Sequence, residues 1–389
     1  MMGNKKKHNI NLRDYGMFIA LIVIVVFFQI LTNGNMLLPM NISGLILQNS
    51  YLICISVGMF FCILTGNVDL AVGASLGFCS AVAGWLIVHK RVNMWPAILI
   101  VLLVGLAIGA FQGFFIAKLK VPPFIATLAG MLIFQGGSLW ILQGHSISPF
   151  PPQFQSIASG YVLETVKVGS MNVFAFLCGV LCCAALLICE FRAYKKSKKY
   201  GTGETVLSFV IIKSVLFCAG ILFITLKLAT ARGIPVILLI LAVIVAVYHF
   251  IATKTVIGRH VFAVGGNKKA AALSGVKVDK IMFIVYTNCG LLAAFGGILV
   301  AARLNAASTT AGSGNELDAI ASCYIGGCAA AGGEGKILGV VIGALVMGVL
   351  NNGMSMMGIG TDIQRVVKGL ILLLAVTFDI YSKSKSSNA

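Results

Sequence analysis

The sequence predicts an all-α fold: a polytopic transmembrane helical bundle of about 10–12 segments, some broken or re-entrant, with an internal repeat of two halves. Hydrophobic residues make up 59% of the 389 residues, charged residues only 10%, and the mean hydropathy is +1.00. Soluble chains carry roughly 25% charged residues. So few charged side chains cannot cover a surface in water, which excludes a soluble enzyme, a nucleic-acid-binding domain and a disordered tail protein.

Runs of about 20 apolar residues mark the predicted spans, because a helix of that length crosses the hydrocarbon core. Twelve such runs lie at about 17–32, 42–65, 70–89, 95–117, 122–143, 171–189, 206–228, 233–252, 281–301, 317–331, 337–352 and 363–380. The run 317–331 is the weakest, since ~15 residues are short for a span. We therefore expect a single membrane domain over 17–380, between a basic N-terminal segment, 1–16, and a C-terminal tail, 381–389.

The basic residues predict the topology. The net charge of +18 indicates membrane topology rather than a nucleic-acid partner, because cytoplasmic loops collect Lys and Arg. Loops on the side of the N-terminus hold 20 of these residues and loops on the other side hold 6. We therefore expect a multi-pass protein of the cell (cytoplasmic) membrane with both termini in the cytoplasm. Two cytoplasmic loops are long: 190–205, a basic insert expected to be a solvated linker, and 253–280.

The two halves, about 17–145 and 171–380, resemble each other. The run GLAIGAFQGFFIAKLKVPPFIATLAGMLIF at 105–134 aligns with GALVMGVLNNGMSMMGIGTDIQRVVKGLILL at 343–373, at an offset of about 240 residues. Upstream, a glycine-rich break with an acid occurs at 66–69 and again at 314–318. Paired glycine-interrupted segments point to the solute pathway in transporters. The alternative is a chance likeness of two glycine-rich helices.

Polar residues within the apolar runs are the candidate pathway residues. An ionised carboxylate at the bilayer centre costs about 2.5–3.5 kcal/mol on insertion scales. Asp69 and Asp318 should therefore face the bundle interior or a water-filled cavity, or cap the helix that follows. The candidate set is Asn67, Asp69, Gln112, Gln135, Asn288, Asn305, Asn315, Glu316 and Asp318. Its amides could equally join helices together.

A second group of charges lies in the last predicted span. Asp362, Arg365 and Lys368 are three residues apart, so they share one helix face and can pair as neighbours. We expect this cluster to snorkel to the membrane interface, with contact to the solute as the alternative.

The loop 253–280 predicts a docking element. Asn267 is a good N-cap, and a short helix from Lys268 to Ser274 should follow it and end at Gly275 as the C′ residue. Small apolar residues exposed on such a helix favour docking on another protein over an ordinary surface turn. The candidate docking residues are Gly265, Gly266, Asn267, Lys268, Ala270, Ala271, Leu273, Ser274 and Gly275.

Motifs for catalysis and metal binding are missing from the sequence. The run AAGGEGKI at 330–337 lacks the first glycine and the final hydroxyl of a Walker A motif. No CxxC pair or HExxH motif occurs, and the five histidines are scattered. We therefore expect no metal site, no catalytic site and no cofactor bound by this chain.

Five motifs resemble the permease subunits of monosaccharide ABC importers, the family of the ribose, galactose and xylose permeases. They are TGNVDLAVGASLG at 65–77, VPPFIATLAGMLIFQGG at 121–137, GRHVFAVGGNKKAAALSGV at 258–276, GNELDAIASCYIGGCAAAGGEG at 314–335 and QRVVKGLILLLAVTFD at 364–379. The loop QGHSISPFPPQFQSI at 143–157 and the basic insert resemble the xylose or multiple-monosaccharide branch most.

This resemblance implies several partners. The permease would pair with itself as a homodimer, and a cytoplasmic ATPase with two nucleotide-binding domains would dock on 258–276. ATP and Mg would be bound by that ATPase, and an extracytoplasmic sugar-binding protein would deliver the solute. We therefore expect the membrane subunit of an ATP-driven monosaccharide importer that works by alternating access.

Three alternatives remain open from the sequence. One is a permease of the same group for nucleosides, branched-chain amino acids or other small solutes. Another is an ion-coupled secondary carrier, since broken helices and repeats also occur there. The third is a membrane scaffold, which the costly acidic breaks argue against.

Overall fold

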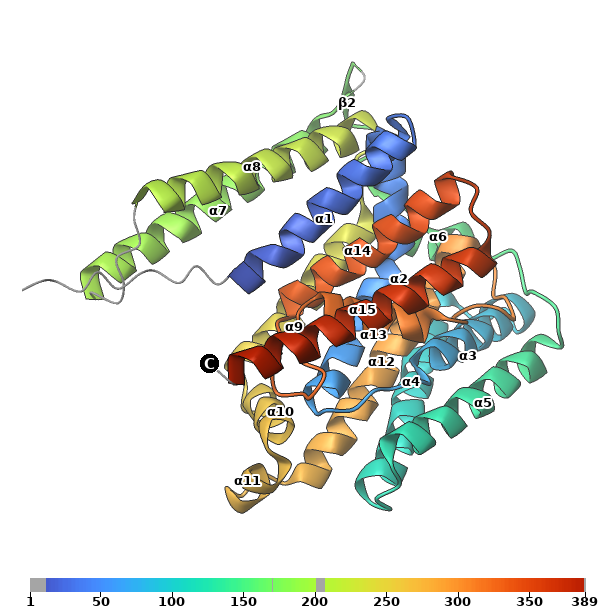
Figure 1. The fold of residues 1–389 in the computed structure, drawn as a ribbon. Helices are drawn as coiled ribbons and strands as arrows, with labels where there is room; N and C mark the ends of the chain where they lie inside the picture. The colour runs from blue at the N-terminus through green and yellow to red at the C-terminus, as the bar shows by residue number, and fades with distance from the viewer. Residues whose placement is uncertain (1–11, 170, 201–206, 388–389) are drawn as a thin grey trace, which may run out of the picture.

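A computed structural model describes residues 12–169, 171–200 and 207–387. The helices are α1 (Leu12–Leu31), α2 (Pro39–Leu64), α3 (Val72–Gly84) with the π-helical turn η2 (Trp85–His89), α4 (Met94–Ala117), α5 (Pro123–Leu142), α6 (Pro152–Ser159), α7 (Val173–Tyr200), α8 (Leu207–Thr230), α9 (Val236–Lys254), α10 (Val256–Gly266), α11 (Lys268–Leu273), α12 (Val278–Leu304), α13 (Asn315–Ile325), α14 (Ile337–Met356) and α15 (Thr361–Ser387). A 3-10 turn, η1 (Asn35–Leu37), joins α1 to α2. The predicted all-α bundle is confirmed (Figure 1).

Two short ribbons are the only strands in the described part of the chain. β1 (Tyr161–Val162) pairs antiparallel with β4 (Ile234–Pro235), and β2 (Lys167–Val168) pairs antiparallel with β3 (Met171–Asn172).

Every predicted span contains a helix, and nine described helices are long and apolar enough to cross a membrane. They are α2, α3 with η2, α4, α5, α7, α8, α9, α12 and α14. The prediction for 317–331 is wrong at its end, because α13 stops at Ile325. Gly327 follows with φ +82, a left-handed conformation that ends a helix. The 11 residues of α13 rise about 16 Å, roughly half the hydrocarbon core.

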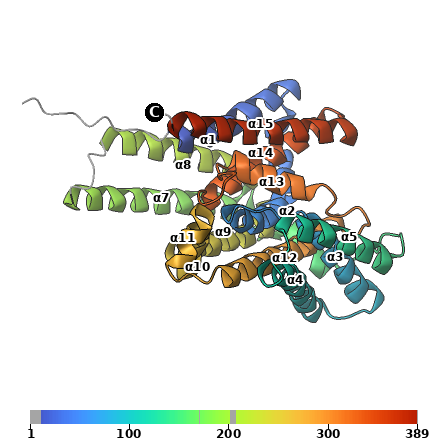
Figure 2. The ribbon, with the colours of Figure 1, turned by 60° about the horizontal axis from the view of Figure 1, so that its bottom comes forward.

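The basic insert is also more ordered than expected. Residues 190–200 are helical instead of an irregular linker, because α7 continues to Tyr200, but most of their described side chains are exposed, as expected of a solvated segment. Lysine is a good helix former, so a helix leaving the membrane can continue through the Lys-rich run. Residues 201–206 of this insert, and parts of the segments 1–16 and 381–389, lie outside the described residues. α7 and α8 form a hairpin along one edge of the molecule (Figures 1 and 2).

The connecting loops sort into two opposite ends of the bundle. At one end, here named the β1 end, Ile147 bridges to Ala307, β1 pairs with β4, and Ser43 Oγ lies 2.8 Å from the Tyr161 hydroxyl. At the other, named the α11 end, Gly333 N donates to Leu64 O at 2.9 Å. If all twelve predicted spans crossed the membrane in alternation, the two chain segments joined by each of these contacts would lie on the same side of the membrane.

The two glycine-rich breaks are re-entrant. α2 ends at Leu64, and the chain turns back at Gly66, which has φ +76. It then runs toward α3 without forming a helix. Asp69 N lies 3.5 Å from Met59 Sδ. Met59 is more than one turn before the end of α2, so the chain has folded back beside that helix. In the second half, α12 ends at Leu304 and a helix-free stretch leads to α13.

The halves pack as an inverted pair. α4 lies against α12, and α14 lies against α2. The close approaches are made by glycines: a Cβ at Gly109 would overlap Tyr286 O of α12, and one at Gly348 would overlap the Asn49 amide of α2. These two glycines are 239 residues apart, which agrees with the predicted offset. Small residues let membrane helices approach closely.

Candidate functional site

The two re-entrant segments cross one another inside the bundle. A Cβ built on Gly73 of α3 would overlap Gly312 O and the Glu316 carboxylate, and one on Gly312 would overlap Gly73 O. Gly312 also has φ +86, which an L side chain rarely adopts. The backbones therefore touch at a point where only glycine fits, and the predicted pathway residue Glu316 lies at this crossing.

Asp69 is buried beside the first break. Only 1% of the residue is exposed, and its Oδ1 accepts the N–H of Ala71 at 2.9 Å. The predicted capping role of Asp69 is wrong, because Ala71 is itself the N-cap residue of α3 and no side chain caps that helix. Gln112 of α4 and Cys289 of α12 face the same carboxylate.

Gln112 is the least satisfied of the predicted residues. It is 1% exposed, and neither amide atom has a hydrogen-bond partner within the described residues. Its amide lies against Ala71 and Gly130. Buried polar side chains are nearly always paired with protein or ordered water, so this amide marks a place where a water or a polar solute can bind.

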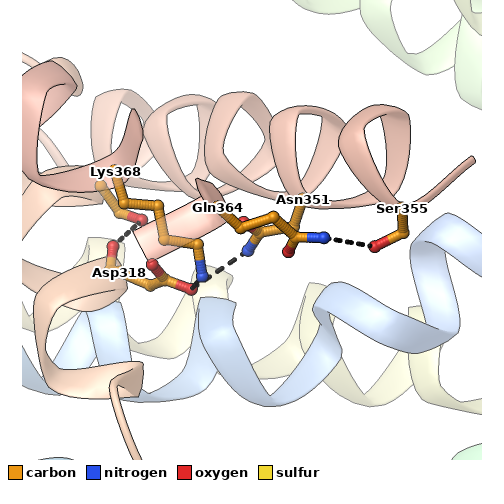
Figure 3. Close-up of polar contacts among 6 residues, drawn as sticks. Asp318, Asn351, Ser355, Gln364 and Lys368 are labelled. Atoms are coloured by element: carbon orange, nitrogen blue, oxygen red, sulfur yellow. Dashed lines mark hydrogen bonds and ion pairs between the residues drawn. The ribbon is translucent and has the colours of Figure 1, made fainter. Parts of the chain in front are cut away.

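Asp318 lies at the centre of a polar network between α13, α14 and α15 (Figure 3). Its Oδ2 accepts from Lys368 Nζ at 2.9 Å and from Asn351 Nδ2 at 3.1 Å. The side chain of Asp318 is 3% exposed and that of Lys368 is 21% exposed. Asp318 Oδ1 and Asn351 Oδ1 are both buried without a partner in the described structure.

Two predictions about these residues are wrong. Asp318 does not cap α13, because it is the fourth residue of that helix and takes side-chain donors. Lys368 does not snorkel outward, because α15 packs on α13 and brings the ammonium to the buried carboxylate. Asn351 is a functional candidate that the sequence reasoning missed, and the sequence reasoning did not foresee that Lys368 pairs with Asp318. The sequence did contain a signal for this pair: a buried carboxylate such as Asp318 requires a cation nearby, and Lys368 lies within a predicted span.

The two halves thus repeat one arrangement. In each, an acid on the broken segment faces an amide on the helix after it: Asp69 faces Gln112, and Asp318 binds Asn351. The second half adds a lysine to the acid. Both arrangements leave buried polar atoms that could hydrogen-bond hydroxyl groups, and Asn49 Nδ2 on α2 is a further one.

The remaining pathway candidates are dispersed. Asn305, at φ +53, accepts from Phe150 N at 2.7 Å and so fastens a loop at the β1 end. Asn288 accepts from the Tyr248 hydroxyl at 2.6 Å, which joins α12 to α9. Gln135 lies on the exposed face of α5, and Asn315 is half-buried at the start of α13. The structure therefore does not bring these four to one place.

A small cavity lies at the α11 end, where the first break meets the connection between α4 and α5. It holds about 230 Å³ and is lined by Gly66, Asn67, Pro122, Pro123 and Tyr324, among others. Asn67 Nδ2 donates to Thr65 O at 3.0 Å. Pockets for drug-sized ligands usually measure ~300–1,000 Å³, so this one suits only a smaller solute.

The predicted docking helix forms as expected. Asn267 Oδ1 accepts the N–H of Ala270 at 2.9 Å and caps α11. Gly275, at φ +84, ends it as the C′ residue, and Val276 N donates to Ala271 O at 3.0 Å, which completes a Schellman motif.

One residue of this helix differs from the prediction. Leu273 is 90% exposed, but Ala271 is buried at 5% exposure, so Ala271 was wrongly placed on the docking surface. The Schellman hydrogen bond from Val276 turns the chain over Ala271 and covers it. Lys268, Ala270 and Ser274 are exposed as expected.

The helix before the docking helix, α10, packs on the chain beside the first break. α10 ends at Gly265 and Gly266, and a Cβ on Gly265 would overlap Leu64 O, the last residue of α2. Gly333 packs on Gly266 and donates to the same Leu64 carbonyl. Gly265 and Gly266 therefore connect the end of α10 to the end of α2, at the first break, and to the loop after α13.

Known proteins similar to this chain are transport permeases. Residues 41–376 match the family described as the permease component of the branched-chain amino acid transport system. The chain is 38% identical to the xylose transport system permease protein XylH of Haemophilus influenzae, over 98% of this chain and 99% of that one. It is 36% identical to XylH of Escherichia coli (strain K12), over 97% and 94% of the two chains. It is 34% identical to the ribose import permease protein RbsC of the same strain, over 93% and 92%.

No solved structure matches the chain significantly. The sequence matches extend over nearly the full length of both chains and include the two broken segments and the docking helix. The resemblance predicted from the five motifs is confirmed. The chain therefore belongs to the permease family of the monosaccharide ABC importers, in the branch of the xylose permeases.

Proposed function

We propose that this chain is the transmembrane subunit of an ATP-driven importer that takes up xylose or a closely related monosaccharide by alternating access. The observation that carries the proposal is the junction at the α11 end. There α10, which leads into the exposed docking helix, packs through Gly265 and Gly266 on the end of α2 at the first break and on the loop after α13. A partner that binds α11 differently in two nucleotide states can shift the permease between two conformations.

The proposal includes three partners. A cytoplasmic ATPase with two nucleotide-binding domains docks on 258–276 and carries the ATP and Mg, and two copies of the permease form the translocating unit. A sugar-binding protein delivers the solute at the β1 end. The protein lies in the cell membrane, and its α11 end and both termini face the cytoplasm. The excess of basic residues in the loops at that end supports this orientation.

The polar groups near the two breaks suit a sugar. Gln112 offers donors and acceptors, and Asp318 and Asn351 each offer a free acceptor oxygen, within a bundle that is otherwise apolar. A solute with many hydroxyl groups can bind such groups without carrying a charge. The relatives named for xylose and ribose support a pentose as the first solute to test.

Reconstitution tests the proposal. The permease, its cognate ATPase and the binding protein would be placed in vesicles, and uptake of labelled xylose, ribose, galactose and glucose measured with ATP. The same vesicles would be run without ATP under a proton or sodium gradient. Uptake that needs ATP and all three components, and that unlabelled xylose suppresses most strongly, is the expected result. Uptake driven by the gradient alone would refute the proposal and indicate a secondary carrier.

A pair of substitutions tests the docking role separately. Leu273→Asp places a charge on a side chain that is 90% exposed, so it should abolish binding of the ATPase and leave the thermal unfolding temperature unchanged. Ala271→Asp is the matched control: it places the charge at a buried position two residues away and should lower the unfolding temperature as well. Full ATPase binding by the Leu273 variant would contradict the docking role.

A further inference from the structure

The bundle has a large apolar groove away from both breaks. It holds about 600 Å³ and lies between α1, α2, α8, α9 and α14. Every residue that lines it is aliphatic, methionine, phenylalanine or glycine, for example Val25, Ile46, Phe223, Leu241 and Leu345. A sugar would find no hydrogen-bond partner there, so the groove does not belong to the solute pathway.

The groove begins near the β1 end. It extends from Met36 and Leu37, in the connection between α1 and α2, to Val341 near the start of α14. The rings of Phe18 and Phe217 meet at 5.6 Å between α1 and α8, beyond Gly220 in the direction of the α11 end, and limit the groove there. Figure 1 shows α1 and α8 running along the same side of the molecule. The groove therefore faces the hydrocarbon of the bilayer.

A cation lies at the mouth of this groove. Lys227, in the last turn of α8, has its Nζ 5.6 Å from the ring centroid of Phe223, which lines the groove. Lys227 has no ion-pair partner among the described residues. A molecule with an apolar chain in the groove would therefore bring a negative group attached to that chain close to an unpaired ammonium.

The lining of the groove favours an apolar chain as its occupant, because no residue in it offers a polar side chain. Protein interiors keep few voids larger than a water molecule, so an open apolar space of this size is filled in the membrane. An acyl chain is the apolar group of matching width that the bilayer supplies.

We propose that this groove is a phospholipid-binding site, in which an acyl chain lies between α1 and α8 and the phosphate pairs with Lys227. Gly220 gives the site a defined test position, because a Cβ there would meet nothing within 4 Å. A large side chain at Gly220 would extend into the groove in place of the acyl chain. Gly136 on α5 also faces open space, away from the groove, and provides the matched control.

The test uses the full-length permease in lipid nanodiscs that contain a phosphatidylethanolamine with a photoreactive group in the middle of one chain. Cross-linked peptides would be mapped by mass spectrometry. We expect adducts concentrated on the groove helices, at least fivefold fewer of them in Gly220→Phe, and an unchanged number in Gly136→Phe. Ala242→Phe, on the α9 wall of the groove, is the second variant if Gly220→Phe does not fold.

A second arm tests the phosphate. A diacylglycerol with the same photoreactive chain should label the groove more weakly than the phospholipid, and Lys227→Gln should remove that difference. Labelling spread evenly over the exposed faces of α5 and α7, or unaltered in Gly220→Phe, would overturn the proposal. Absent lipid labelling together with cross-links between α1 of one copy and α8 of another would also overturn it, and would identify the groove as a contact between copies.

Discussion

Removing the cation of the Asp318–Lys368 pair should destabilise the permease far more than removing both charges together. The two groups are 2.9 Å apart, and their side chains are 3% and 21% exposed. At an effective dielectric constant of about 20, two charges at this distance attract by about 6 kcal/mol. Burying the two ions costs several kcal/mol each. The pair as a whole is therefore close to neutral in free energy, whereas a single buried charge left behind is costly.

The variants are Lys368→Met, Asp318→Asn and the double substitution, with Arg365→Met as the comparison at an exposed residue one turn earlier in the same helix. Lys368→Met should lower the free energy of unfolding by about 3–5 kcal/mol, because Asp318 keeps its buried charge and loses its partner. Asp318→Asn should cost less, about 1–3 kcal/mol, because Lys368 can reach water. The double variant should come within about 2 kcal/mol of the wild type, and Arg365→Met should stay within about 0.5 kcal/mol.

Reversible denaturation in mixed micelles measures these values, and ATP-driven uptake by the reconstituted complex measures function on the same variants. The double-mutant cycle is the deciding quantity. A coupling free energy above ~1.5 kcal/mol supports a buried pair. If the changes in unfolding free energy of the two single variants sum to that of the double variant within about 0.5 kcal/mol, the reasoning is refuted, because the effects of residues that do not interact are additive.

Three further predictions concern glycines and the unpaired amide. Gly312→Ala should lower the free energy of unfolding by about 2–5 kcal/mol, because the new Cβ would sit at a positive φ and overlap Gly73 O. Gly314 has φ +82 but open space around it, so Gly314→Ala should lower the same free energy by only about 1–2 kcal/mol in the same denaturation assay. Gly275→Ala should unwind the end of the docking helix, lower the free energy of unfolding by about 1 kcal/mol, and weaken ATPase binding in a pull-down assay. Asparagine tolerates the left-handed conformation, so Gly275→Asn should retain binding. Gln112→Met should leave stability within about 1 kcal/mol of the wild type, because the amide has no partner to lose, and should reduce the uptake rate if the amide contacts the solute; full uptake would exclude that contact.

The spans and the repeat could be predicted because the bilayer imposes them. A helix that crosses the membrane needs about 20 apolar residues, so hydropathy alone located every helix that is long enough to span. The offset of the two halves was visible in the glycines of α4 and α14, since only small residues allow the close packing seen at Gly109 and Gly348.

The errors have a common physical origin. The spacing of Asp362, Arg365 and Lys368 shows that they share a face of α15, but not which helix that face meets. The partner of Lys368 is set by α13, some 50 residues earlier, and by the inverted packing of the halves. Ala271 was misplaced for a related reason, because its burial depends on the turn that Gly275 and Val276 make after the helix.

The same arrangement is stabilised differently in the two halves. In the second half, Lys368 and Asn351 both bind Asp318, so protein groups satisfy most of what the acid requires. In the first half, the amide that faces Asp69 has no protein partner at either of its atoms, and no lysine or arginine pairs with that acid within the described residues. An ion pair between two helices keeps them together, whereas an unpaired amide can exchange one water or hydroxyl for another at little cost. The inverted repeat therefore combines one half held internally by charge with one half whose polar groups remain available to a mobile partner.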